Sequence, residues 1–275
     1  MVRSAFVGLC AALVVAAAAG CGGGGGVDAP TTTIRQLRQF RILFPEGFTR
    51  VQMAARAETV AKIAVSESHR KVKISGAAYA AATAKPRAIA GFGSKKLPLE
   101  GFLFPDTYNF DRKTTSAQLA NVQLQEFASK WKTLNLSYAR SKNLTAYDVL
   151  TIASMIEKEA VAPGDRAKVA RVIYNRLHLG MSLGIDATIR YALHIPGTKS
   201  LTQSELANPT PYNTRLHTGL PPTPIANPGL ASMEAAAQPA EGPWLYFVAE
   251  PDKVHTYFTA SAQAFEHYKA THGYG

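Results

Sequence analysis

The stretch from Thr145 to Ala160 is typical of one amphipathic helix that ends in a carboxylate where its own pattern calls for an apolar residue. Thr145 can accept a hydrogen bond from the amide of Asp148 while Asp148 reaches back, which is a capping box just ahead of an apolar run. At about 100° per residue, Glu159 falls inside the apolar arc. The residues that form this arc are Val149, Ile152, Ala153, Ile156 and Ala160.

Glu159 is the candidate catalytic residue of this helix. A carboxyl at the margin of a packed face is partly desolvated, which raises its pKa toward the range that suits a general acid. The helical pattern equally allows a solvated helix end that carries both Glu157 and Glu159, because carboxylates near helix ends are common. Evidence from other segments of the chain is needed to distinguish the two interpretations.

The charge of the chain is compatible with an anionic neighbour but does not by itself establish one. Among 275 residues, 30 are Lys or Arg and 19 are Asp or Glu, which gives a formal net charge of +11. This balance suits nucleic acid, a membrane surface or an acidic cell-wall polymer, and solubility alone would also account for it. The apolar fraction of 47% is enough for a core of one sizeable domain and a small one.

Residues 1–26 are typical of an export segment followed by a glycine tether. Arg3 precedes the apolar run Ala5–Ala19, which is shorter than the roughly 20 residues of a spanning helix. Cys21 after Ala-Ala-Gly is similar to a bacterial lipobox, so we expect attachment to the cell membrane by lipidation or by an uncleaved signal anchor. The rest of the chain is then expected outside the cytoplasm. Cys10 and Cys21 are the only cysteines, so no disulfide or thiol chemistry is expected beyond this segment.

The remaining chain divides into two predicted parts, which together form an α+β protein. Residues 27–98 read as a small module with a polar linker at 27–33 and then one or two strands and two helices. The strand candidate is Phe40–Phe44, and the helices are Phe48–His69 and Ala77–Ala84. Residues 99–275 read as a larger, mostly helical domain. Beside the central helix, its predicted helices are Ser116–Asn135, Arg166–Leu179, Ala231–Ala237 and Ala262–Thr271, with a hairpin of Trp244–Ala249 and His255–Thr259.

Leu99–Phe110 reads as an aromatic loop that carries Glu100 and Asp106. Aromatic rings beside carboxylates are typical of sugar-binding sites, because the apolar faces of pyranose rings stack on them. The alternative, which the pattern favours, is a purely structural turn that Phe102 and Phe104 pack onto the core.

Two further segments carry candidate site residues. Asp186 precedes a short helix that ends near Leu193, and capping that helix is its expected single role. The segment Pro209–Pro228 is too rich in proline for a helix or a central strand, so a rigid loop is expected to hold Tyr212 and Asn213 in place.

Several chemistries find no support in the sequence. The seven histidines show neither an i, i+4 pair nor the clustered acids that zinc sites need, so no metal and no cofactor is expected. A Gly-x-Ser-x-Gly elbow is absent, and no nucleic-acid-binding signature is present. Acid/base chemistry by carboxylates is what remains.

Six blocks of this chain, in order, resemble the endolytic murein transglycosylases, the YceG-like family. The blocks are Leu99–Tyr108, Ile152–Glu159, Val172–Leu177, Pro211–Thr214, Gly219–Pro222 with Ile225–Gly229, and Tyr246–Val248 with His255. The resemblance implies a membrane-attached lyase outside the cytoplasm that cuts nascent peptidoglycan strands between N-acetylmuramic acid and N-acetylglucosamine. It also implies a LysM-like small module, a lysozyme-related helical domain and a catalytic role for Glu159.

A lytic transglycosylase needs one carboxyl, whereas ordinary glycosidases need two. Protonated Glu159 would donate to the leaving oxygen, and its carboxylate would then take the proton of the muramic acid C6 hydroxyl as a 1,6-anhydro ring closes. Tyr212 and Asn213 are candidates to hydrogen-bond Glu159 or the acetamido group, and Glu100 and Asp186 to shape sugar subsites. The rivals are a hydrolase with Asp186 or Glu100 as second carboxylate, and a non-catalytic wall-binding scaffold. Cell-wall synthases are the expected protein partners.

Overall fold

The structure is a computed structural model that describes residues 38–160, 162–252 and 254–273. All of these residues belong to one compact unit. The predicted export segment, with Cys21 and the glycine tether, lies outside the described residues, as does the predicted linker at 27–33. In the part that is described, no helix combines the length and the apolar character that a membrane crossing requires.

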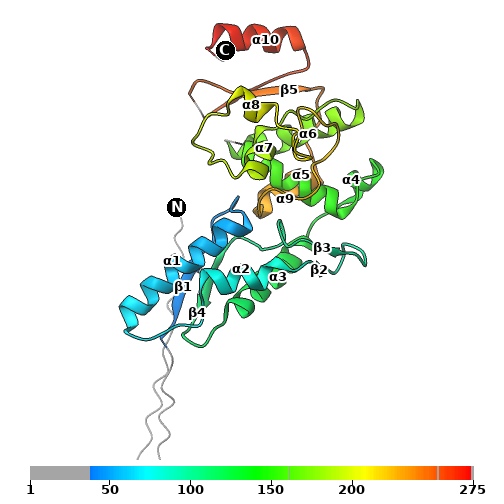
Figure 1. The fold of residues 1–275 in the computed structure, drawn as a ribbon. Helices are drawn as coiled ribbons and strands as arrows, with labels where there is room; N and C mark the ends of the chain where they lie inside the picture. Colours follow the sequence, from blue (N-terminus) through cyan, green and yellow to red (C-terminus); the bar gives the residue numbers. More distant parts are fainter. Residues whose placement is uncertain (1–37, 161, 253, 274–275) are drawn as a thin grey trace, which may run out of the picture. The chain divides into compact units, whose positions relative to one another are not determined.

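The first half of the described chain contains four short strands and three helices (Figure 1). The strands and helices are β1 (Phe40–Leu43), α1 (Arg50–Ser68), α2 (Gly76–Ala84), β2 (Arg87–Ala88), β3 (Lys96–Leu97), β4 (Thr107–Phe110) and α3 (Ser116–Trp131). The predicted strand and all three predicted helices of this half are present. The α3 helix ends four residues earlier than expected.

The second half is mostly helical and ends in a hairpin followed by a helix. Its elements are α4 (Ser137–Ser141), α5 (Ala146–Glu159), a 3-10 turn (Pro163–Asp165), α6 (Arg166–His178), α7 (Asp186–Leu193), α8 (Gln203–Leu206), α9 (Leu230–Ala237), β5 (Tyr246–Ala249), β6 (Thr256–Thr259) and α10 (Ala262–Thr271). This mixed architecture, mostly helical with small antiparallel sheets, confirms the predicted α+β class.

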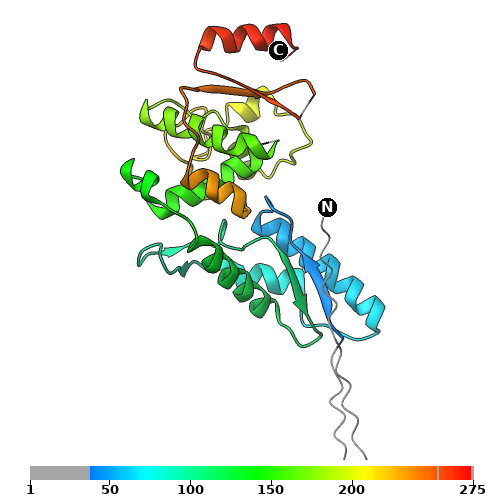
Figure 2. The same ribbon diagram turned by 180° about the vertical axis from the view of Figure 1, so that it is seen from behind.

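Each of the three sheets has two antiparallel strands, and the β1–β4 pair corrects one prediction. Phe40 pairs with Phe110 and Leu43 with Thr107, so the end of the predicted aromatic loop is a strand (Figure 2). Tyr108 and Phe110 are buried and Asn109 is exposed. This alternation spans only four residues, which is too short for a pattern to establish, and its partner strand lies far upstream in the sequence.

Two hydrophobic cores share the helix α3. The first core gathers β1, α1 and α2 and also takes in Leu103, Tyr108 and Leu119. The second core is built around α5 and receives Phe127 and Trp131 from the other end of α3. The first core therefore extends past the expected module boundary at residue 98.

The predicted capping box of α5 is confirmed, and the helix is more deeply buried than expected. The Thr145 hydroxyl accepts a hydrogen bond from the Asp148 amide at 3.2 Å, and the Thr145 amide donates to the Asp148 carboxylate at 2.8 Å. Every residue from Val149 to Ile156 is buried, because α6, α7 and α9 pack around the helix (Figure 1). The last turn is less buried, since Lys158 is exposed and Glu159 is half-buried.

Candidate active site

Glu159 is the last residue of α5, and its side chain is half-buried. Burial raises the pKa of Glu159 to about 7, and the negative charge of Asp186 acts in the same direction. A hydrogen bond from the Ala187 amide opposes this shift, as do the charges of Arg190 and Arg215. The Ala187 amide lies in the first turn of α7, where amides have no partner within the helix. Glu159 can therefore hold a proton near neutral pH and can also carry a stabilised negative charge.

Asp186 does not cap α7, which corrects the sequence prediction. It is the first residue of the helix, the N-cap is Ile185, and the N-cap side chain makes no capping hydrogen bond. The carboxylate of Asp186 instead accepts a hydrogen bond from Nε of Arg215 at 2.6 Å, with both side chains partly exposed. A partner 29 residues away cannot be read from a local capping pattern.

A cavity of about 520 Å³ adjoins Glu159. Lys158, which precedes Glu159, and Ala187, which donates to it, both line this cavity, although the Glu159 side chain is not part of the wall. The wall is built by the start of α1, the end of α2, the segment before β4, α7 with the turn that follows it, and the proline-rich loop. The lining residues that matter below are Arg50, Glu100, Lys158, Arg190, Tyr191 and Tyr212.

Glu100 lines the cavity but is 5% exposed and is held by three donors. The amide of Arg50 and Nδ2 of Asn227 donate to it, each at 2.9 Å, and the Tyr191 hydroxyl donates at 3.2 Å. Burial raises the pKa of Glu100 to about 7, and these hydrogen bonds work against the shift. Glu100 thereby ties the start of α1 to α7 and to the proline-rich loop. Its predicted part in a sugar subsite stays a prediction.

Tyr212 lines the cavity next to Tyr191, with ring centroids 5.3 Å apart. The hydroxyl of Tyr212 shares a hydrogen bond of 2.9 Å with that of Thr223, which also belongs to the wall. The proline-rich loop thus presents an aromatic face to the cavity. A pyranose ring can stack on such a face.

Asn213 is fully buried and serves the loop itself. Its Nδ2 donates to the carbonyls of Leu206 and Asn208 at 2.9 and 2.8 Å, and its Oδ1 accepts from the Arg215 amide at 3.0 Å. Asn213 is not one of the residues that line the cavity. Its hydrogen bonds fix the loop backbone from which Arg215 reaches Asp186, and its predicted contact with Glu159 or a sugar stays a prediction.

Arg190, Tyr191 and Asn227 are site residues that were not predicted from the sequence. One signal was available for the first two, because Ala187, Arg190, Tyr191 and His194 follow the i, i+3, i+4, i+7 spacing of one helical face. All four line the cavity. No comparable local signal exists for Asn227, whose partners come from distant segments.

Replacement of Asn227 by alanine should lower the free energy of unfolding by about 2 kcal/mol, because buried groups would lose their partners. Oδ1 of this fully buried side chain accepts from the Leu103 amide, and Nδ2 donates to the Phe48 carbonyl and to Glu100, each at 2.9 Å. Urea unfolding measures the change. The control is Asn121→Ala, whose hydrogen bond with Arg87 is exposed and worth less than about 0.5 kcal/mol. Equal losses in the two variants would contradict the structural role of Asn227.

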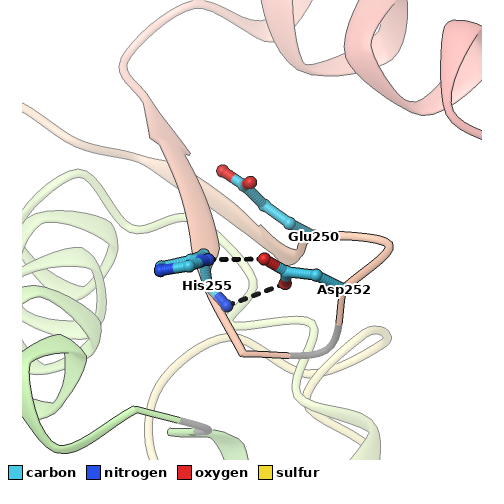
Figure 3. Close-up of side chains that lie close together, drawn as sticks. All are labelled: Glu250, Asp252 and His255. Atoms are coloured by element: carbon cyan, nitrogen blue, oxygen red, sulfur yellow. Dashed lines mark hydrogen bonds and ion pairs between the residues drawn. The ribbon is translucent and has the colours of Figure 1, made fainter.

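One group of possible metal ligands lies in the turn between β5 and β6 (Figure 3). Ligand atoms of Glu250, Asp252 and His255 all lie within 4.8 Å of one another, so the prediction that no histidine has clustered acids does not hold here. Asp252 Oδ1 accepts from the amides of Val254 and His255, and Oδ2 lies 2.5 Å from Nδ1 of His255. Asp252 and His255 are exposed, and hydrogen bonding within the turn accounts for the arrangement.

The YceG-like family model matches residues 27–271, and the chain belongs to this family. A protein of Bacillus subtilis (strain 168), named endolytic murein transglycosylase, is 39% identical over 180 residues, which cover 65% of this chain and 49% of that protein. A protein of Streptococcus pneumoniae (strain ATCC BAA-255 / R6) with the same name is 36% identical over 180 residues, which cover 63% of this chain and 32% of that protein. The match thus spans about half or less of these relatives' length.

A crystal structure of a protein described as yceG-like, from Listeria monocytogenes, has a similar fold. The TM-score is 0.66 at 31% identity, with 83% of this chain and 74% of that chain covered. The likeness therefore extends over most of the described elements.

Proposed function

We propose that this protein is an endolytic lytic transglycosylase of peptidoglycan, which cuts the bond between N-acetylmuramic acid and N-acetylglucosamine. The observation that carries the proposal is the half-buried Glu159, with its pKa raised to about 7, beside a cavity of about 520 Å³. The names of the Bacillus and Streptococcus relatives point to the same reaction.

Glu159 acts as the single acid and base in this proposal. In its protonated form it donates to the glycosidic oxygen, so the C1–O bond of muramic acid breaks and the N-acetylglucosamine hydroxyl leaves. The C6 hydroxyl of the same muramic acid attacks C1, and the Glu159 carboxylate takes its proton. Because the nucleophile belongs to the substrate itself, the reaction consumes no water and needs no second carboxylate. The Ala187 amide stabilises the carboxylate between the two proton transfers.

The setting of this reaction is part of the proposal. We place residues 1–26 in or on the membrane, through a signal anchor or a lipidated Cys21, with the cavity outside the cytoplasm and cell-wall synthases as partners. The basic, apolar and small-residue order of this segment supports the placement. We liken the part of the chain around the first core to a LysM module and the part around α5 to the lysozyme-related helical domains.

A peptidoglycan hydrolase is the second candidate, and the position of Asp186 favours it. Its charge lies close enough to raise the pKa of Glu159, so two carboxyls of different character lie at one site. A hydrolase would use Asp186 as base or nucleophile. The Asp186 carboxylate accepts a hydrogen bond from Nε of Arg215 at 2.6 Å, which fixes its position at the site.

Mass spectrometry of the ends of digested, uncrosslinked glycan strands separates the candidates. The proposal predicts 1,6-anhydromuramic ends. Reducing muramic ends would establish the hydrolase, and intact strands would leave a non-catalytic wall-binding scaffold.

Activity should fall as the pH rises above about 7. Because Glu159 must be protonated to donate, kcat/KM should drop about tenfold per pH unit above its pKa. Asp186→Asn should move the midpoint to lower pH, since the negative charge of Asp186 raises the pKa of Glu159. Initial rates of anhydro-end release between pH 5 and pH 9 test both statements, with pH limits chosen to bracket a pKa of about 7. A rate that stays constant up to the upper limit would contradict the assigned proton donor.

A further inference from the structure

Three cationic side chains from three separate helices line the cavity. Arg50 begins α1, Lys158 lies near the end of α5, and Arg190 lies in α7. His194, at the end of α7, also belongs to the wall. Convergence of positive charges from distant parts of the chain does not follow from the local sequence of any one helix.

No carboxylate of the described chain lies in ion-pair contact with these cations, although Arg190 acts on the charge of Glu159 and Arg50 on that of Glu100 from a greater distance. Nη1 of Arg50 donates to the Ala80 carbonyl at 3.3 Å, and Nζ of Lys158 donates to the Gly47 carbonyl at 3.3 Å. Nη1 of Arg190 donates to the Pro196 carbonyl at 3.0 Å. Across residues 38–160, 162–252 and 254–273, no ion pair involves Arg50, Lys158 or Arg190. Each side chain is instead held by backbone carbonyls, which for Arg190 include that of Lys199.

Glu100 is the one acidic residue among the residues found to line the cavity. Its oxygens are occupied by the Arg50 amide, Asn227 and Tyr191, and burial shifts its pKa upward toward neutrality. Near pH 7 it therefore carries only part of a negative charge, against three cationic side chains in the same wall. The wall of the cavity is positive overall.

We propose that this cavity binds the carboxylates of the peptide stems that hang from the glycan strand, and that Arg50 and Arg190 determine this preference. The proposal rests on the function proposed above. Sugar hydroxyls and acetamido groups are neutral, so they give three unpaired cations no partner of opposite charge. The carboxylates of the peptide that is linked through the lactyl group supply this opposite charge. The planar guanidinium group of Arg can bind a carboxylate with two hydrogen bonds.

Arg50 gives α1, whose buried face belongs to the first core, a part in substrate selection. It lies at the start of α1, and its backbone amide is the donor to Glu100. The part of the chain that resembles a glycan-binding module therefore forms one wall of the same cavity. A strand in this cavity would touch both halves of the protein at once.

The test uses the full chain with Glu159→Gln, so that strands stay intact during calorimetric titration. The two probes are uncrosslinked peptide-bearing strands of equal length, both with acetylated amino groups, one with free carboxylates and one with those carboxylates converted to amides. The charged probe should bind at least about tenfold more tightly, a difference of 1.4 kcal/mol, and salt near 1 M should remove most of the advantage.

Arg190→Gln and Arg50→Gln, each added to Glu159→Gln, should weaken binding of the charged probe about tenfold and leave the amidated probe nearly unchanged. Lys62→Gln is the matched control, because Lys62 lies on the exposed face of α1, pairs with Glu58 and does not line the cavity. Equal affinity for the two probes would overturn the proposal, as would arginine variants that lose both probes equally.

Failure of this proposal differs from failure of the proposed function. If the unmodified protein releases anhydro ends from both probes at the same rate and the two bind equally, the function stands and the charge preference is wrong. If the unmodified protein cuts neither probe while the charged one still binds more tightly in an arginine-dependent way, the cavity assignment stands and the enzymatic function is wrong.

Discussion

Glu159→Gln is expected to reduce the release of anhydromuramic ends by about a thousandfold or more, the size of effect that general acid–base catalysis supplies. Glutamine keeps the shape of the side chain and can still accept from the Ala187 amide, but it has no proton to donate to the leaving oxygen. Initial rates on uncrosslinked strands, with products separated by chromatography and identified by mass, measure the loss. The melting temperature should change little, because the substituted group is only half-buried.

Glu157→Gln is the matched control, two residues away on the same helix. The Glu157 carboxylate accepts a hydrogen bond from the Gly229 amide at 3.1 Å, just ahead of α9, and glutamine can accept the same bond. Its activity should therefore stay within a few-fold of the unmodified protein. If Glu157→Gln were inactive and Glu159→Gln active, the catalytic residue would be misassigned.

Gly101→Ala is expected to lower the free energy of unfolding by about 4 kcal/mol, by combining backbone strain with overpacking. Gly101 has φ +90°, and an added Cβ would lie 2.7 Å from Cβ of Pro224 and 3.2 Å from Cδ2 of the buried Leu150. Neither a proline ring in a rigid loop nor a fully buried leucine can move aside at low cost. Urea unfolding followed by circular dichroism gives the value.

Gly91→Ala separates the effect of backbone strain from the effect of overpacking. Gly91 has a similar φ of +87°, but its added Cβ would meet nothing within 4 Å. Only the backbone term remains, which amounts to about 1–2 kcal/mol. A Gly101→Ala loss as small as the Gly91→Ala loss would show that Pro224 and Leu150 do not confine this position.

Features set by neighbours in sequence could be predicted, and the central helix is the clearest case. The α5 capping box involves residues three positions apart, and the place of Glu159 on the helical wheel follows from the same periodicity. The strand β4 could not be found in this way. Its four residues carry too little alternation, and their partner strand β1 precedes them by more than 60 residues.

In the candidate site, too, contacts between residues far apart in the sequence could not be predicted. Asp186 lies in a good sequence position for a helix cap, yet Arg215 engages it across 29 residues. Asn213 follows Tyr212 in a proline-rich loop, yet only Tyr212 reaches the cavity, because the side chain of Asn213 turns inward to the loop carbonyls. The wall that α1 contributes depends on Glu100 accepting from the Arg50 amide, a contact between residues 50 positions apart.

The most direct test of a single carboxyl working with an internal nucleophile is a digestion in water enriched in heavy oxygen. Muramic ends are then analysed by mass spectrometry. Anhydro ends that contain no heavy oxygen are expected, because the C6 hydroxyl closes on C1 and water does not take part. Reducing ends that carry one heavy oxygen at C1 would contradict it, and would assign Glu159 and Asp186 to a hydrolase instead.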